Sequence, residues 1–208
     1  MARKLLLITI LAFLLGPLAA FADDDDNHRR LKAVPFAFVG TAEECGGPAG
    51  SRIITSAWLG GMGLPDNGGQ NTTAADVATN PNKGDPHLGL LLSKNGATAD
   101  CSAAGAEIKG VKGIEVTADF HLGFDYRNGG HCGAGAPRFN VVSKTGSTET
   151  FHFVGGCSNG TPTSAGQDPD EWTQVRFDTS NSNQSFPVIP PGSRIKSIRS
   201  HFKTCGIG

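Results

Sequence analysis

The clearest pattern along this chain is an alternation of apolar and polar residues over positions 114–126. The apolar positions are Ile114, Val116, Ala118, Phe120, Leu122, Phe124 and Tyr126. A period of two predicts a strand with one buried face and one solvated face. At ~3.3 Å per residue this segment would exceed ~40 Å, which is longer than usual, so we expect a bend or bulge near Gly123.

Shorter runs of apolar and β-branched residues predict further strands. They lie at residues 34–39, 52–59, 87–92, 138–142, 150–154 and 172–177. The segments 138–142 and 150–154 form a predicted hairpin, with its turn over residues 144–147. We expect Phe151 and Phe153 to face the core in this hairpin, and His152 to lie on the solvated face.

Glycine, asparagine, threonine and serine separate these runs, which favours strands joined by turns. We therefore expect an all-β fold, an antiparallel two-sheet sandwich of jelly-roll type over residues 33–208, after a disordered tail at 23–32. The predicted buried layer comprises Phe36, Trp58, Leu90, Val116, Phe120, Leu122, Phe124, Phe139, Val141, Phe151, Phe153, Val175 and Phe177. Residues 97–109 are alanine-rich without a helical pattern, and the spacing of Ile195 and Ile198 fits neither period.

Residues 1–22 have the pattern of an export signal. Arg3 and Lys4 precede an apolar run from Leu5 to Leu15, and Ala20-Phe21-Ala22 offers the small residues that signal peptidase accepts. We expect cleavage after Ala22 and a secreted or periplasmic mature protein. The apolar run is shorter than the ~20 residues that span a bilayer, so we expect no membrane span in the mature chain.

The charge balance narrows the choice of partners. The chain has 18 basic and 19 acidic residues, and the predicted cleavage removes two of the basic ones. The resulting mild negative charge is not typical of a protein that binds nucleic acid or anionic lipid. Gly-x-Ser-x-Gly, His-Glu-x-x-His, phosphate-loop and dinucleotide motifs are absent from the sequence, so an enzyme is less expected than a binding protein.

Five cysteines follow the predicted leader, and an exported protein is expected to oxidise them. Counting outward from the hairpin turn places Cys157 opposite about residue 135. We therefore expect a Cys132–Cys157 disulfide that clamps the open end of the hairpin. Cys45–Cys101 is the second predicted pair, which leaves Cys205 as a free thiol or an intermolecular link.

Residues 127–137 (RNGGHCGAGAP) contain four glycines, which permit close approach of the backbone to a ligand. In one interpretation Asp125, Arg127 and His131 surround a ligand with the help of Arg138 and Asn140. In the other, the segment is a tight crossover held by Cys132, with Arg127 or Arg138 paired to Asp125.

Two metal sites are conceivable. If the strands that carry them are adjacent, His121, His152 and Asp119 could bind zinc. The alternative is that these side chains lie on a solvated sheet face. The Asp- and Asn-rich loop at 66–85 offers oxygen ligands for calcium, although it lacks a calcium-loop motif. Otherwise we expect no cofactor.

The segments AWLGGMGLPDNGG, DPHLGLLLSKNG, GFDYRNGGHCGAGAPRFNV and HFVGGCSNGTP resemble a group of uncharacterised bacterial secreted proteins. The similarity spans about residues 52–178. It implies a single β-sandwich domain of jelly-roll type and export, and it carries no activity or site. In that group a final strand rich in acidic and apolar residues follows RIKSI, whereas this chain continues with residues 199–208.

The most favoured function is a non-catalytic extracellular binding module for a glycan or a cell-surface component. One alternative is a secreted hydrolase with a metal or carboxylate site around Asp119, His121, Asp125 and His152. Another is a structural envelope protein whose odd cysteine links chains. The oligomeric state stays open at this point.

Overall fold

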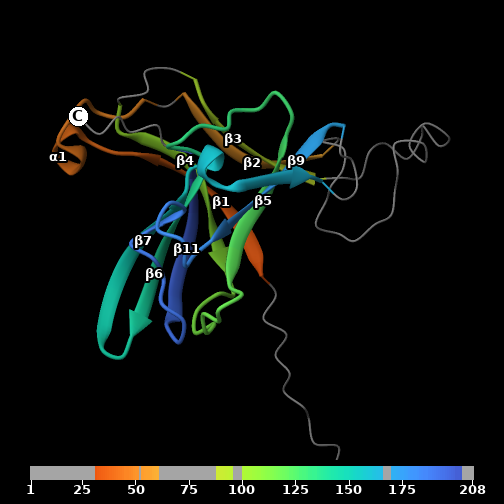
Figure 1. Ribbon diagram of the computed structural model, residues 1–208. Helices are drawn as coiled ribbons and strands as arrows, with labels where there is room; N and C mark the ends of the chain where they lie inside the picture. Colours follow the sequence, from red (N-terminus) through yellow and green to blue (C-terminus); the bar gives the residue numbers. More distant parts are fainter. Residues whose placement is uncertain (1–30, 52, 61–87, 96–99, 166–169, 203–208) are drawn as a thin grey trace, which may run out of the picture.

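The computed structural model describes residues 31–51, 53–60, 88–95, 100–165 and 170–202, and within them the chain is almost entirely antiparallel β-structure (Figure 1). The strands are β1 (Lys32–Val39), β2 (Ile54–Gly60), β3 (Leu88–Lys94), β4 (Ser102–Lys109), β5 (His121–Arg127), β6 (Arg138–Thr145), β7 (Thr148–Gly155), β8 (Thr161–Ser164), β9 (Trp172–Asp178), β10 (Ser185–Phe186) and β11 (Arg194–Phe202). The two helices in these ranges are α1 (Ala42–Cys45) and η2 (Cys157–Asn159). Neither is long enough to cross a membrane. The all-β prediction is confirmed.

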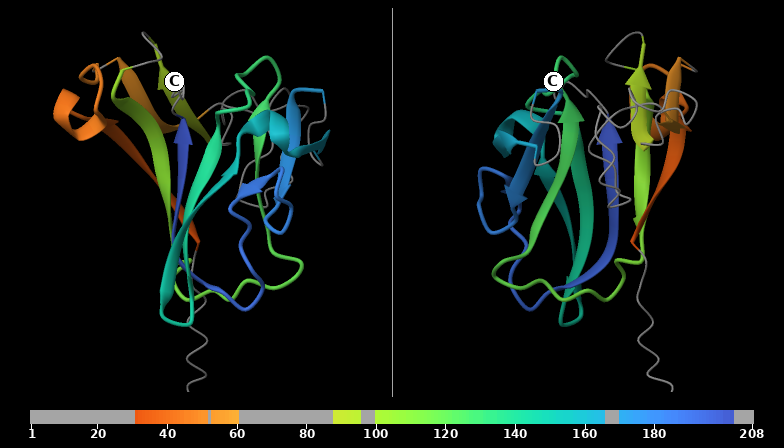
Figure 2. Two further views of the ribbon diagram at one scale, coloured as in Figure 1. Left: turned by 60° about the vertical axis from the view of Figure 1, so that its left-hand side comes forward. Right: turned by 90° about the vertical axis from the view of Figure 1, so that its right-hand side faces the viewer.

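The strands form one large sheet and two small ones. The large sheet has the order β1-β4-β11-β6-β7-β10, and the small sheets are β2-β3 and β5-β9-β8. In the right-hand view of Figure 2, β11 (blue) runs through the middle of the large sheet, between β4 and β6. Trp58 of β2 donates its indole N–H to the carbonyl of Ala33 at 2.9 Å. The β2-β3 sheet therefore covers the β1-β4 half of the large sheet.

The other half of the same face is covered by β5-β9-β8. The ring of Phe139 on β6 lies 5.9 Å from Phe124 on β5 and 6.2 Å from Phe177 on β9. These contacts belong to the hydrophobic core, whose fully buried members are Val111, Val116, Phe139, Val141, Val154, Cys157, Val175, Phe177, Ile189, Ile195 and Ile198. The predicted burial of Val116, Phe139, Val141, Val175 and Phe177 is confirmed, and Phe120, Leu122 and Phe124 pack against this core half-buried.

The predicted inner face of β7 is wrong. Thr145 pairs with Thr148 across a two-residue turn, so His152 lies opposite Val141 on the core side. Phe151 and Phe153 point outward and are 46% and 41% exposed. The expected turn centre was off by half a residue, and a one-residue slip in register moves every side chain to the other face.

The predicted strand over 114–126 is also interrupted. Strand β5 begins only at His121, because the chain turns at residues 117–120. Before this turn, Val116 donates to Ser193 at 2.8 Å and Ile195 donates to Ile114 at 2.8 Å. The even-numbered apolar residues nevertheless face the core on both sides of the turn, since Val116 and Phe124 both pack there.

Two central strands were not recognised from the sequence. The alanine-rich β4 pairs with β1 and β11, and the Phe36 ring of β1 lies against Gly105, where a Cβ atom would clash with it. Strand β11 lies between β4 and β6, and its register shifts between Ile195 and Ser197. That bulge explains why the spacing of the two isoleucines fits no single period. Between β7 and β9, the described residues 156–165 contain η2 and β8.

Candidate functional site

A cavity of about 550 Å³ opens between the two small sheets, and we call it the groove. One wall is β3 with Trp58 of β2, and the other is β5 with the start of β9. The floor is the part of the large sheet that lies between them. The lining residues are Ala33, Trp58, Leu88, Gly89, Leu90, Leu91, Leu92, Ala106, Ile108, Gly123, Phe124, Asp125, Tyr126, Arg127, Gly130, His131, Pro137, Phe139, Trp172, Arg176 and Ser200.

The β3 wall and the floor are largely apolar. Trp58 and Leu90 are register partners and share the face that looks onto the large sheet, where Ala106 and Ile108 meet them. Because the indole N–H of Trp58 is already bonded to a backbone carbonyl, its ring offers the groove an apolar surface. An apolar pocket of this size with a few polar groups is typical of ligand sites.

The β5 wall carries the charges. Asp125 forms an ion pair with Arg176 of β9, with a nitrogen–oxygen distance of 3.2 Å, and Arg127 pairs with Glu171 at 3.3 Å. The Arg176 guanidinium also donates to the carbonyl of Phe124 at 3.3 Å. These contacts orient the charged groups along one side of the groove. Part-exposed pairs of this kind contribute little to stability.

The structure brings together three of the five residues predicted to bind a ligand. Asp125, Arg127 and His131 line the groove. Arg138 and Asn140 lie on the opposite face of the large sheet, where the Arg138 guanidinium lies 4.8 Å from the centroid of the Phe153 ring. The crossover alternative paired Asp125 with Arg127 or Arg138, whereas Asp125 forms its ion pair with Arg176.

The segment after β5 is held by a disulfide, as predicted. Cys132 bonds to Cys157 at the start of η2, with a Cα–Cα distance of 4.9 Å. Gly133 donates to Ala136 at 2.9 Å and accepts from Ser158 at 3.3 Å. The bridge therefore fixes the backbone next to His131. The second predicted pair, Cys45–Cys101, is also present, with a Cα–Cα distance of 5.9 Å.

The structure does not assemble the predicted zinc ligands. Strand β5 pairs with β9, whereas β7 pairs with β6 and β10, so His121 and His152 lie in different sheets. His152 is buried, with one ring nitrogen 2.8 Å from the Ser143 hydroxyl and the other 2.8 Å from the Pro187 carbonyl. Asp119 lies in the exposed turn before β5. No cluster of three potential metal ligands occurs among the described residues, and the proposed calcium loop at 66–85 lies outside them.

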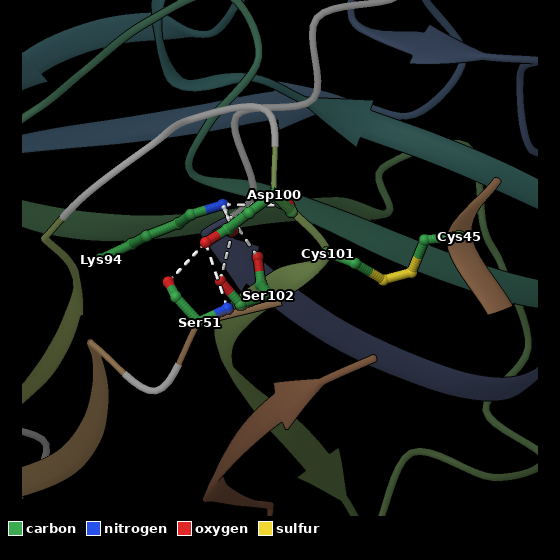
Figure 3. Close-up of polar contacts among 6 residues, drawn as sticks. All are labelled: Cys45, Ser51, Lys94, Asp100, Cys101 and Ser102. Atoms are coloured by element: carbon green, nitrogen blue, oxygen red, sulfur yellow. Dashed lines mark hydrogen bonds and ion pairs between the residues drawn. A yellow bond between two sulfur atoms is a disulfide. The ribbon is translucent and has the colours of Figure 1, made fainter. Parts of the chain in front are cut away.

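A second polar cluster lies beside the Cys45–Cys101 bridge (Figure 3). Lys94 forms a buried ion pair with Asp100 at 2.6 Å. Asp100 also accepts hydrogen bonds from the hydroxyls of Ser102 and Ser51 and from the Ser51 amide. The hydrogen bond from Lys94, followed by those from Ser102 and Ser51, holds the pKa of Asp100 well below its usual range. Since donors saturate the carboxylate, this cluster joins β3, β4 and the segment before β2 rather than offering a free ligand.

Sequence reasoning missed much of the groove. Trp172 and Arg176 lie in a predicted strand whose alternation gave no sign of a site, and Tyr126 was assigned only to the apolar face of the strand predicted over 114–126. For the β3 wall, the available signal was the run of leucines, in which residues on both faces of the strand are apolar. No protein-family model, curated protein or solved structure matches this chain. The groove is therefore the feature of the molecule that indicates a function.

Proposed function

We propose that this protein is a non-catalytic extracellular binding module and that the groove holds its ligand, a glycan or a cell-surface component. The observation that carries the proposal is the composition of the groove. In this cavity of about 550 Å³, Trp58 and Leu90 line the inner part next to the large sheet, whereas Asp125 and Arg127, which alternate with the core-facing Phe124, line the outer part. Such a site binds a ligand that has one apolar side and one polar side.

Two further features support this function. The two disulfides fit an oxidising compartment, where binding modules of the cell surface work. The charged groups Asp125 and Arg127 are each engaged with an oppositely charged neighbour. Groups held in this way fix the orientation of a ligand through charge-assisted hydrogen bonds.

Retention of the full-length protein on cellulose, xylan, chitin, peptidoglycan and bead-bound peptides tests the proposal. We expect at least one support to retain the protein and Arg127→Ala to weaken that binding about tenfold, because a charge-assisted hydrogen bond is lost. Arg194→Ala is the matched control. Arg194 is also an exposed arginine paired with a glutamate, Glu115 at 3.0 Å, and it lies outside the groove.

Two results would contradict the proposal: no support retains the protein, or both arginine variants weaken retention equally. Assays for released reducing sugar and for cleaved peptide accompany the binding test. Release of product by the wild type would favour the hydrolase instead. A non-reducing gel tests the third function, since cross-linking through an odd cysteine would give covalent dimers that a reductant separates.

A further inference from the structure

We propose that the ligand of the groove is an extended polypeptide that inserts as an additional strand between β3 and β5. This inference rests on the proposed function and names the class of ligand. Every residue from 88 to 92 of β3 and from 123 to 127 of β5 lines the cavity. Because successive side chains of a strand point to opposite faces, an unbroken run can line a cavity only along the edge of the strand. The groove is therefore bounded by two strand edges.

Neither edge is used by another described strand. Strand β3 pairs only with β2, and β5 pairs only with β9. Both strands lie over the same face of the large sheet, so their sheets are two separate parts of one covering layer. A strand placed between them would make that layer continuous.

The backbone groups that face the groove on the β3 side follow from the hydrogen-bond pattern. Asn95 donates to Ile53 at 2.9 Å, which marks this pair as hydrogen-bonded. Such pairs alternate along an antiparallel ladder, so Leu91 bonds to β2 and its two neighbours point away from β2. The amides and carbonyls of Leu90 and Leu92 are therefore directed into the groove.

The β5 side has the complementary arrangement. Asn128 donates to Glu171 at 2.7 Å, which sets the same alternation between β5 and β9. Residues 122, 124 and 126 bond to β9, and the amides and carbonyls of Gly123 and Asp125 point into the groove. The carbonyl of Arg127 accepts from Gly130 at 2.9 Å, which closes the ladder at this end. Donors and acceptors thus repeat at every second residue on both walls, which matches the backbone of a strand.

The size and lining of the groove indicate the peptide. A residue in a strand occupies roughly 160 Å³, from a rise of ~3.3 Å, a strand spacing of ~4.8 Å and a sheet spacing of ~10 Å. The groove therefore encloses about three residues, with the flanking residues outside. The floor beneath includes Ala106, Ile108, Phe139 and Ser200 and is largely apolar, so we expect apolar side chains at the inward positions. Polar side chains at the outward positions would meet Arg127 and His131.

The test uses a bead-bound library of peptides of about nine residues that alternate apolar and polar positions, with the polysaccharides and peptidoglycan as parallel arms. We expect retention of a subset of peptides. The best of these is then synthesised with N-methyl groups on every second amide, in each of the two possible registers. Because an inserted strand bonds to β3 with one set of amides and to β5 with the other, both series should bind about tenfold more weakly or worse. Weakening in only one register would overturn insertion in favour of pairing with a single edge.

Hydrogen–deuterium exchange provides the second readout. The amides of Leu90, Leu92, Gly123 and Asp125 should exchange quickly in the free protein and become protected with the peptide. Protection of these amides before any peptide is added would overturn the inference. Leu90→Pro removes one groove-facing N–H from an edge strand, where proline is tolerated, and should weaken peptide binding up to about tenfold while circular dichroism stays unchanged.

The two proposals fail in different ways. If a glycan or peptidoglycan binds through Arg127 and no peptide is retained, the inserted strand is refuted and the binding module stands. If no arm of the test retains the protein, the binding module is refuted as well.

Discussion

Removal of the Cys132–Cys157 disulfide tests how far the groove depends on a covalent clamp. In the double variant Cys132→Ser/Cys157→Ser the unfolded chain regains the freedom of a loop that joins residues 25 positions apart. For a loop of this length, the chain-entropy relation predicts that the free energy of unfolding falls by roughly 3.5 kcal/mol. For a domain of this size, that loss corresponds to a fall in melting temperature of roughly 7–14 °C. The same change also releases the backbone beside His131, so ligand binding in the groove should weaken.

The measurement is urea unfolding at pH 7, with Cys205→Ser as the control because Cys205 belongs to neither disulfide pair. The equivalent variant of the Cys45–Cys101 pair, whose cysteines are 56 positions apart, should lose slightly more, about 4 kcal/mol. A loss below about 1 kcal/mol in the Cys132/Cys157 variant would refute the reasoning. So would a wild-type protein whose unfolding midpoint does not change when dithiothreitol is added.

Three further predictions concern the interior. Phe177→Ala should lower the free energy of unfolding in urea by about 3–5 kcal/mol because Phe177 is fully buried. Phe186→Ala, at a side chain that is 72% exposed, should change it by no more than about 0.5 kcal/mol, and equal effects would contradict the assigned core. His152→Leu should lower the free energy of unfolding by about 1–3 kcal/mol, since it leaves the buried Ser143 hydroxyl without its partner and leaves the Pro187 carbonyl with Ser185 alone. A zinc-dependent melting temperature in the wild type would contradict the structural role of His152. Asp100 has a pKa below its ordinary value of 3.8, so its contribution is present above about pH 4 and is lost as the pH falls further. The stability difference between wild type and Asp100→Asn should therefore shrink between pH 5 and about pH 2, and a difference that grows in this range would show the opposite linkage.

The sequence predicts strands and their inner faces where a single alternation decides both. Val116, Phe124 and Val175 are inside because apolar residues at every second position leave no other buried face. The hairpin shows the limit of this reasoning. Phe151 and His152 exchange faces because the turn that joins β6 to β7 is centred between residues 146 and 147, half a residue beyond the expected centre at residue 146. Apolar content alone favoured the phenylalanines, and turn geometry prevailed.

Strand β4 was missed for a different physical reason. Its residues are small, so it has no amphipathic alternation, and its position is set by larger neighbours such as Phe36, which lies over Gly105. Stability in such a strand comes from pairing on both sides and from cover supplied by other elements. Neither property is encoded within the segment itself.

The groove could be predicted only in part because it depends on which strands lie next to each other. Asp125, Arg127 and His131 are close in sequence, and the glycine-rich segment after β5 was a sufficient signal for them. The opposite wall, Leu88 to Leu92, meets them only through the order of strands in three sheets, which local periodicity does not contain.

The depth of the groove has its own origin in the sequence. The large sheet is six strands wide, and the two small sheets are anchored at separate places, by the Trp58–Ala33 hydrogen bond on one side and by Phe124 against Phe139 on the other. Between these anchors the floor includes Ala106 and Ser200, whose side chains fill little space. Larger apolar residues there would have filled the cavity and brought it closer to the packing density of a protein interior. Small residues below, and two strand edges that no described strand occupies, together leave the groove between the two small sheets.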